Sequence, residues 1–361
     1  MPLERTLIWA FAVIHAALIL NALANVWWFW KKPKPANVGS LPRVSVLVPA
    51  RNEESNLPRL IKSFRAQNHP DAELILYDDL SEDNTWEIIQ QFSSTRIKGV
   101  KGEQLPPGWV GKVNGCYQLS LQASGEVFLF LDADTEFLSP SALRNMCTRF
   151  HSRTPSTFLT GMTLLKGKGH LIVSFVGNFI LSGIPWWLAE KVPFSIMSGV
   201  NGQCWMITAK KYRELEPHIE VKSEVLEDVM LGRYLHKCGL IPVLDDVRGD
   251  LAVHMYSSFG EAWKGFRKNV AFMLGGSAFT SLLMLSVFGA LFIYAPILSV
   301  WFLVPMYLVK GITDRITKQS WLITLLAPVS YVLAIVLGLD SILTRSLGRI
   351  KWKGRSIEKS K

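Results

Sequence analysis

Two aspartates directly follow an apolar run at residues 127–131, and one residue separates them. Asp132 and Asp134 therefore lie in the turn that we expect after a buried strand. Carboxylates at this spacing can bind a divalent cation, which in turn neutralises a diphosphate. A solvated turn could contain the same residues. The metal interpretation rests on the buried strand before them and on acidic residues that end other strands.

Acidic and polar residues also follow two further segments, 43–49 and 73–77, that we predict to be strands. Arg51 and Glu53 come after the first, and the aspartate pair at 78–79 comes after the second. Ligands of parallel α/β sheets bind beyond the carboxyl ends of the strands. The three strand ends therefore predict one site, although a helix cap plus a turn would also explain the aspartate pair.

A third acidic pair, Glu227 and Asp228, begins a predicted helix over 229–237. A carboxylate at a helix start is often only a cap that interacts with the helix dipole. The functional alternative is a general base that removes a proton from an acceptor hydroxyl. The spacing alone favours the cap.

The elements that must position these residues lie in a segment that we assign to residues 40–268. Strand-like and helix-like runs alternate along it, which predicts an α/β domain. Residues 53–67 show the apolar spacing of a helix, and residues 83–92 open with capping residues.

Apolar segments flank this domain. Residues 6–30 contain no Lys, Arg, Asp or Glu and end in three tryptophans before lysines, so residues 1–34 are predicted to form a spanning helix with a basic cytoplasmic flank. Residues 269–344 are predicted to be a second membrane region. We expect an interfacial stretch near 270–282, one span over 283–309 and a returning span over 320–343. A hairpin within 269–309, giving three spans, is the alternative.

Charge supports a membrane location. The formal net charge is +10, mean hydropathy is +0.22 and only 19% of residues are charged. Residues 31–43 carry net +4 and the tail 345–361 carries net +6, which places the excess beside the apolar segments. This pattern indicates a multi-pass protein of the cell membrane with the domain and tail in the cytoplasm, and no nucleic-acid partner.

One further apolar run, residues 169–189, is long enough to be taken for a spanning helix. We instead expect it to be an interfacial helix that lines the acceptor site. The acidic motifs on its two sides must meet in one site, and a single crossing would separate them across the bilayer. The four cysteines form no CxxC pair, which argues against a zinc site or a disulfide framework.

Together the motifs resemble those of family-2 glycosyltransferases, and residues 40–268 look like their GT-A catalytic domain. The matching segments, in the order of that family, are 49–54 (PARNEE), 77–85 (YDDLSEDNT), 111–114 (GKVN), 131–135 (LDADT) and 227–228 (ED). Segments 105–112, 263–269 and 352–355 are similar to the membrane-bound branch linked to carotenoid and hopanoid biosynthesis, with bacterial carotenoid-acid glucosyltransferases as the nearest comparison.

The resemblance implies a role for each matching residue. Donor binding falls to Pro49, Arg51, Glu53, Asp78, Asp79, Lys112 and Asp132. The acceptor would meet Gly202, Gln203, Trp205, Trp263 and Arg267. The metal, Mn2+ or Mg2+, would be held by Asp134, Asp132 and His254, although a structural role for that histidine is the alternative. Asp228 would be the base, beside Glu227.

Two departures from the family pattern bear on function. The common DDGS sequence has leucine in place of glycine at position 80, and the QxxRW element of processive polysaccharide synthases is missing. The expected activity is therefore a single inverting transfer of a sugar, glucose by resemblance, from a UDP-sugar to a membrane lipid such as a carotenoid acid or hopanoid. The alternatives are a polyprenyl-phosphate sugar synthase and a non-catalytic membrane scaffold, which would have lost acids at random.

Overall fold

The computed structural model describes residues 2–30, 40–153, 157–189, 191–192, 198–224, 226–275, 277–347, 351–352 and 355–356. Its internal contacts divide the chain into two units. We call residues 32–166, 189–254 and 359–361 the sheet unit, and residues 1–31, 167–188 and 255–358 the helical unit. The predicted basic flank at 31–34 and most of the predicted basic tail lie outside the described residues.

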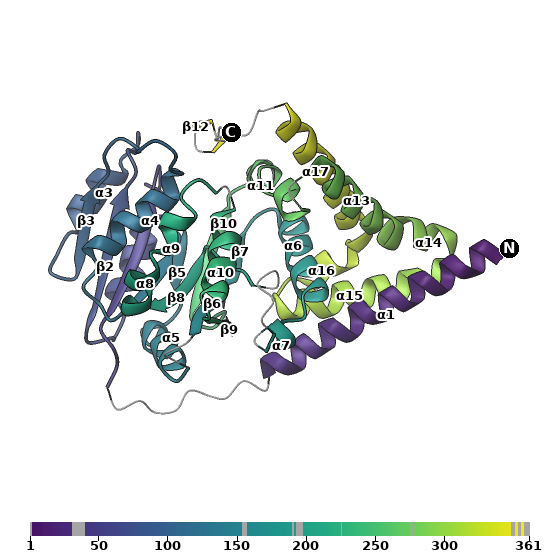
Figure 1. Cartoon of the computed structure of the whole chain (residues 1–361), viewed down its shortest axis with the longest axis horizontal. Coiled ribbons are helices and arrows are strands. Elements are labelled where there is room, and N and C mark those ends of the chain that lie inside the picture. The colour runs from purple at the N-terminus through teal and green to yellow at the C-terminus, as the bar shows by residue number, and fades with distance from the viewer. Residues whose placement is uncertain are drawn as a thin grey trace. The chain divides into compact units, whose positions relative to one another are not determined.

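The sheet unit is built on a seven-stranded mixed sheet with the order β3-β2-β1-β4-β8-β6-β9. Figure 1 labels β3, β2, β8, β6 and β9 of this sheet. In that order the strands are Ile97–Lys101, Ala72–Asp78, Val44–Ala50, Val127–Leu131, Cys204–Thr208, Thr157–Met162 and Ile241–Asp246. Strand β1 pairs in parallel with both β2 and β4, and β8 is antiparallel to β4 and β6. The predicted α/β class and the predicted strands at 43–49, 73–77 and 127–131 are confirmed.

Both faces of this sheet are buried, which explains why its central strands are continuously apolar. Alternate residues of β4 face different cores. Val127, Leu129 and Leu131 join one hydrophobic cluster, whereas Phe128 and Phe130 join the other. Helices α2 (Leu57–Arg65), α3 (Thr85–Phe92) and α5 (Ala142–His151) cover the first face. Helices α4 (Gly111–Gln122), α8 (Ala209–Leu215) and α10 (Glu227–Lys237) cover the second.

A smaller three-stranded sheet has the order β5-β10-β7. These strands are Thr135–Phe137, Leu251–Tyr256 and Leu164–Gly167. The antiparallel pairing of β5 with β10 matches Thr135 to Val253. Strand β5 therefore starts directly after Asp134, so the small sheet fixes the backbone that follows β4.

The helical unit contains α1 (Pro2–Trp30), α6 (His170–Gly183), α11 (Phe259–Arg267), α12 (Val270–Met273), α13 (Ala278–Gly289), α14 (Ala295–Leu298), α15 (Leu303–Ile316), α16 (Trp321–Leu325) and α17 (Ala327–Ser346). The two short helices α7 (Trp186–Ala189) and α9 (Pro217–Glu220) complete the α-helices of the described residues. Among the described residues, three stretches are long and apolar enough to cross a membrane: Leu3–Trp30, Ala278–Leu298 and Ala327–Ser346.

The structure differs from the predicted carboxyl-terminal spans in one respect. A single helix over 283–309 is wrong, because the helical run from Ala278 ends at Leu298 and Ser299 is extended, with φ −152° and ψ 124°. A separate helix, α15, then begins at Leu303. Hydropathy could not reveal this break, since the residues on both sides of it are equally apolar.

Residues 169–189 form α6 and α7 rather than one helix, and Pro185 lies between them. Asn25 of α1 donates hydrogen bonds of 2.8 Å to the carbonyls of Leu181 and Ile184. By internal contacts, residues 167–188 and 255–268 group with the terminal helices and not with the sheet. The boundaries 40–268 and 269–344, and the interfacial role of 169–189, stay predictions.

A buried ion-pair cluster ties α5 to β9 and to the loop that follows it. The guanidinium of Arg149 lies 2.6 Å from the carboxylate of Asp245 and 2.6 Å from that of Asp250. All three side chains are mostly buried. Removing one partner of such a cluster leaves uncompensated buried charge.

We therefore expect Arg149→Met to lower the free energy of unfolding by about 3–5 kcal/mol, because two buried carboxylates lose their counter-ion. Thermal unfolding of the full chain in detergent would show this as a lower midpoint. The matched control is Arg144→Met, on the same helix, where the side chain is exposed and makes no ion pair among the described residues. Equal midpoints for the two variants would contradict the prediction.

Candidate active site

The ends of β1, β2 and β4 meet at one edge of the seven-stranded sheet. Their parallel register aligns Ala50 with Asp78, and the amide of Asp79 donates a 2.8 Å hydrogen bond to the carbonyl of Ala50. Asn52 and Leu80 both have φ of +52°, in the left-handed region that tight turns require. The strand ends thus bring together the residues that the sequence placed at one site.

Arg51 holds the turn that follows β2. Its buried guanidinium donates hydrogen bonds to the carbonyls of Asp79, at 2.6 Å, and Leu80, at 3.0 Å. Asp78 supports the same turn, because its carboxylate accepts a hydrogen bond from the amide of Ser81. The predicted donor-binding residues therefore organise one another's backbone.

Residues that the sequence analysis did not assign to the site fix the loop after β1. The hydroxyls of Ser81 and Thr85 accept hydrogen bonds from the amides of Asn52 and Glu53, at 2.9 and 2.7 Å. The carboxylate of Asp83 accepts one from the amide of Glu54. The polar segment that follows β2 is therefore a brace for this loop. The run of polar residues at 81–85 was visible in the sequence. The sequence did not show which backbone amides these side chains would bind.

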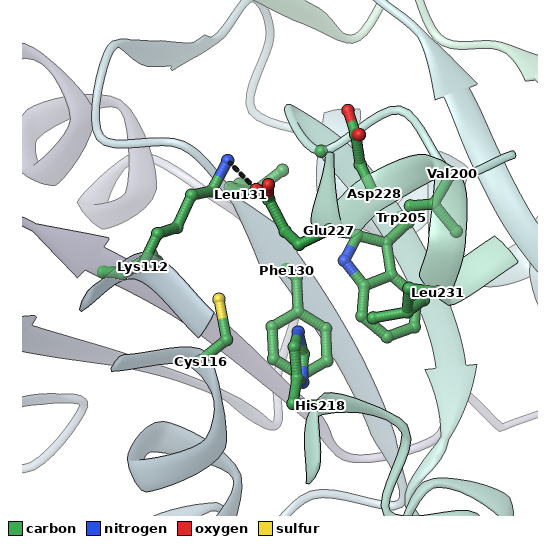
Figure 2. A pocket seen from close by; sticks show the side chains of 12 residues that line it. Lys112, Cys116, Phe130, Leu131, Val200, Trp205, His218, Glu227, Asp228 and Leu231 are labelled. Carbon is green, nitrogen blue, oxygen red and sulfur yellow. Dashed lines mark ion pairs between the residues drawn. The ribbon is translucent and has the colours of Figure 1, made fainter. Parts of the chain in front are cut away.

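Lys112, at the start of α4, connects the acids of two elements. Its ammonium nitrogen lies 2.7 Å from Asp132 Oδ1 and 3.5 Å from Glu227 Oε1. Figure 2 shows the pairing with Glu227. Burial alone would lower the pKa of Lys112, but the two carboxylates outweigh it and hold that pKa well above its usual value. The lysine is therefore charged and neutralises part of the acidic cluster.

The surroundings of the Asp134 carboxylate favour a bound cation. Its Oδ1 atom is buried and has no hydrogen-bond partner among the described residues. Burial, followed by the negative charges of Asp132 and Glu53, raises the pKa of Asp134 well above its usual value. A divalent cation at this carboxylate would relieve both effects, so Asp134 and its neighbour Asp132 fit a metal site. The described part of the chain shows no preformed group of three or more His, Cys, Asp or Glu ligands.

His254 lies next to Asp134 through the backbone, since its amide donates a 2.9 Å hydrogen bond to the Asp134 carbonyl. The imidazole itself points elsewhere. Its Nε2 atom is 2.8 Å from the carboxylate of Glu136, which also pairs with Lys166 at 3.0 Å. This pairing matches the structural alternative, and a metal role for His254 stays a prediction.

Glu227 and Asp228 occupy the first turn of α10. The residue at the N-cap is Leu226, so neither carboxylate is the cap, and Asp228 Oδ1 accepts a hydrogen bond from the adjacent amide of Val229 at 2.8 Å. Burial raises the pKa of Asp228 to about 7, and the negative charge of Glu227 contributes, while Lys112 opposes the rise. A carboxylate with a pKa near neutrality suits a general base.

A small pocket lies beneath these acids, with a cavity of about 20 Å³, enough for one water molecule. Its walls are Pro49, Lys112, Cys116, Phe130, Leu131, Val200, Gly202, Trp205, His218, Glu227, Asp228 and Leu231. In Figure 2 the carboxylate of Asp228 points away from Cys116 and His218. His218, which the sequence analysis missed, is hydrogen-bonded to the Tyr212 hydroxyl at 2.6 Å, and burial lowers its pKa to about 3. It is therefore neutral.

The five predicted acceptor residues belong to different parts of the structure. A side chain at Gly202 would start 3.2 Å from the Lys112 nitrogen and 3.4 Å from Cβ of Asp228, so glycine lets the backbone approach both. Trp205 is buried and stacks on Phe130, with ring centroids 4.4 Å apart, which makes it part of the core below the site.

The other three predicted acceptor residues make contacts of their own. The side-chain oxygen of Gln203 accepts a hydrogen bond from Thr163 at 3.0 Å. Trp263 and Arg267 belong to α11 of the helical unit, where both approach Asp340, at 2.7 and 3.7 Å. The acceptor role of all five residues stays a prediction.

Comparisons with known proteins relate this fold and part of the sequence to a known class. Residues 45–162 match the family model described as Glycosyl transferase family 2. The solved mannosyltransferase PcManGT from Pyrobaculum calidifontis, in complex with GDP-Man and Mn2+, has a similar fold, with a TM-score of 0.57 and 14% identity over 95% of this chain and 99% of that one. Residues 45–162 therefore carry the sequence pattern of glycosyltransferase family 2, and the chain has the GT-A-like α/β fold.

Curated relatives agree with the family. A 4,4'-diaponeurosporenoate glycosyltransferase of Staphylococcus haemolyticus is 27% identical over 237 residues, which cover 63% of this chain and 61% of the relative. A GalNAc(5)-diNAcBac-PP-undecaprenol beta-1,3-glucosyltransferase of Campylobacter jejuni is 34% identical over 140 residues, 38% of this chain and 43% of the relative. The chain thus spans about three fifths or less of these relatives. The resemblance drawn from the sequence motifs is confirmed.

We expect Asp134→Ala to abolish binding of Mn2+, because the substitution removes the carboxylate with the buried, unpartnered oxygen. Electron paramagnetic resonance of free Mn2+ during titration of the purified full chain measures this without any turnover. Asp71→Asn is the control, since Asp71 is exposed and pairs on the surface with Arg43. Unchanged Mn2+ binding by Asp134→Ala would remove this residue from the metal site.

The raised pKa of Asp228 also predicts a pH-dependent stability. A carboxyl whose pKa rises from 3.8 to about 7 on folding destabilises the folded state once it ionises. The penalty is absent below the unfolded pKa and complete above about pH 7. Asp228→Asn should therefore unfold at a higher temperature than the parent protein at pH 8, and this difference should disappear toward pH 4. A difference that stays constant with pH would contradict the raised pKa.

Proposed function

We propose that the protein transfers a sugar from a nucleoside-diphosphate sugar to a lipid acceptor in a single, inverting displacement. The observation that carries this proposal is the concentration of four carboxylates and one lysine, from the turn after β4 and the first turns of α10 and α4, in a domain that matches family 2. Asp134 has a buried oxygen that needs a cation, and Asp228 has a pKa of about 7. A site with an electrophile-stabilising group and a separate base suits this reaction.

Asp134 and Asp132 would hold a divalent cation, which neutralises the charge of the departing diphosphate when it is bound. The loop braced by Arg51 would bind the nucleotide base beside Asp79. Lys112 would contact the diphosphate, and its present pairing with Asp132 and Glu227 keeps its charge at the required position. By the motif resemblance, the donor is UDP-glucose.

Asp228 would take the proton from the acceptor hydroxyl as the oxygen attacks the anomeric carbon. The carboxylate must then lie within about 3 Å of that oxygen. Burial, followed by the negative charge of Glu227, raises the pKa of Asp228 to about 7, so that proton transfer is effective near neutral pH. The configuration of the sugar inverts, because attack occurs opposite the departing diphosphate.

Two observations support a lipid acceptor. Within the part of the chain that the structure describes, three helices are long and apolar enough to cross a membrane. The Campylobacter jejuni relative is named for a PP-undecaprenol acceptor, and the Staphylococcus haemolyticus relative for diaponeurosporenoate. We propose a carotenoid acid or hopanoid as acceptor, and a multi-pass location in the cell membrane with the sheet unit in the cytoplasm. A polyprenyl phosphate is the competing acceptor, and it would need no base because it is already ionised.

We expect Asp228→Asn to keep UDP-glucose binding and to lose about 10²–10⁴-fold in turnover on a hydroxyl lipid, because it removes the general base. A carboxylate lipid, which is ionised at neutral pH, should lose far less. Labelled UDP-glucose with hydroxyl, carboxylate and phosphate lipids, followed by product analysis, measures both effects. Asp71→Asn serves again as the control. Normal turnover of the hydroxyl lipid by Asp228→Asn would leave Asp228 with a structural role only.

A further inference from the structure

A second pocket lies within the helical unit, between α15 and α16. Its volume is about 330 Å³, within the range of ligand sites. The lining residues are Tyr307, Gly311, Arg315, Gln319, Trp321, Thr324 and Leu325. None of them takes part in the family motifs, and none has a role in the proposed reaction.

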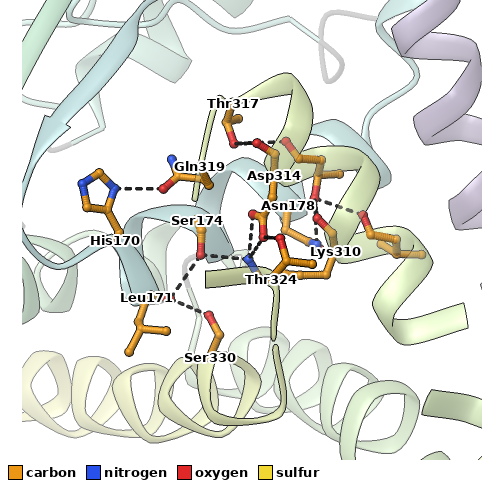
Figure 3. Close-up of polar contacts among 12 residues, drawn as sticks. His170, Leu171, Ser174, Asn178, Lys310, Asp314, Thr317, Gln319, Thr324 and Ser330 are labelled. Atoms are coloured by element: carbon orange, nitrogen blue, oxygen red, sulfur yellow. Dashed lines mark hydrogen bonds and ion pairs between the residues drawn. The ribbon is translucent and has the colours of Figure 1, made fainter. Parts of the chain in front are cut away.

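The floor of this pocket is fixed by a buried polar network (Figure 3). Thr324 donates a 2.8 Å hydrogen bond to Asp314, whose carboxylate accepts two further bonds, of 2.7 and 2.6 Å, from the ammonium of Lys310. Lys310 also donates to Ser174 of α6 at 3.0 Å. The backbone amide of Gln319 donates to the Asp314 carbonyl at 2.8 Å. Thr324 and Gln319 are therefore held in place before any ligand arrives.

Two hydrogen-bond donors at the pocket, the Arg315 guanidinium and the side-chain nitrogen of Gln319, have no acceptor among the described residues. Arg315 is exposed and makes no ion pair with the described residues, and the neighbouring charge of Asp314 is already neutralised by Lys310. The side-chain oxygen of Gln319 pairs with His170 at 2.8 Å, whereas its nitrogen makes no hydrogen bond within the described structure. A positively charged fork beside an amide donor is the arrangement that recognises an anionic oxygen group such as phosphate.

The walls of the pocket are apolar and exposed. Trp321 is 71% exposed and Leu325 is 57% exposed, and the adjacent Leu322 is 50% exposed. Tyr307 adds a second aromatic ring, whose hydroxyl donates to the Leu325 carbonyl. Helix α16 leads directly into α17, one of the three stretches that can span a membrane. Aromatic residues next to an arginine at the end of such a helix are typical of the lipid headgroup region.

We propose that the α15–α16 pocket binds the phosphate headgroup of an anionic membrane phospholipid, with Arg315 and the Gln319 amide on the phosphate and Trp321 and Leu325 against the acyl chains. A free phosphate would leave these apolar walls exposed, which favours the lipid. The inference does not depend on the proposed sugar transfer, because it concerns residues of the helical unit alone.

Native mass spectrometry of the full chain in detergent, titrated with phosphatidylglycerol or phosphatidylcholine, tests the proposal. The chain should bind one phosphatidylglycerol more tightly than phosphatidylcholine. Arg315→Gln should weaken that binding by about tenfold or more, because a charge-assisted hydrogen bond is lost. Arg315→Lys should restore part of it. Lys318→Gln, an exposed cation three residues away that does not line the pocket, is the matched control.

Each outcome decides between the explanations. Equal affinity of Arg315→Gln and the parent protein would overturn the proposal, and so would an equal loss in Lys318→Gln, which would indicate general charge attraction. Competition by millimolar inorganic phosphate would overturn the lipid as the source of the phosphate. Circular dichroism and thermal unfolding of Arg315→Gln establish that the variant is folded. Failure of the sugar-transfer experiment would leave these results unaffected.

Discussion

Lys112 places its positive charge between Asp132, in the turn after β4, and Glu227 on α10, and the candidate site depends on this contact. The carboxylates at 132, 134, 227 and 228 come from two segments that are far apart in sequence, and they would repel one another at close range. The lysine allows the first turn of α10 to pack beside the end of β4. It also affects Asp228, where burial and then Glu227 raise the pKa and Lys112 lowers it. Gly202 leaves room for the lysine.

Much of the sheet and of the position of the site could be predicted from the sequence. Apolar runs of five to seven residues that end in acids were sufficient to identify β1, β2 and β4, and the rule for parallel sheets placed their ends together. The side-chain partners at those ends could not be predicted. Arg51 reaches the carbonyl of Asp79, and Thr85 accepts from the Glu53 amide, because two left-handed residues turn the loops toward each other. A sequence alone does not reliably predict those dihedral angles.

The contacts of His254 and Trp205 could not be predicted either, because they depend on how the strands pair. The imidazole of His254 pairs with Glu136 because β10 aligns antiparallel with β5, and that register is set by packing that a single sequence does not reveal. Trp205 stacks on Phe130 because β8 pairs antiparallel with β4, so the tryptophan points into the core. In the helical unit, the length of the uncharged runs of sequence predicted helices that can span a membrane. Hydropathy does not distinguish a lipid-facing helix from one that other helices enclose.

The position of α6 in the chain has a consequence for the order in which the protein is made. Asn178 of α6 donates hydrogen bonds to Thr313 of α15 and Tyr331 of α17, which follow it by 135 and 153 residues. The ribosome therefore releases α6 long before its partners exist, while Asn25 of α1, synthesised earlier, is already present to contact the carbonyls of Leu181 and Ile184. The first helix of the chain can thus hold α6 during synthesis until the last helices arrive to satisfy its buried amide.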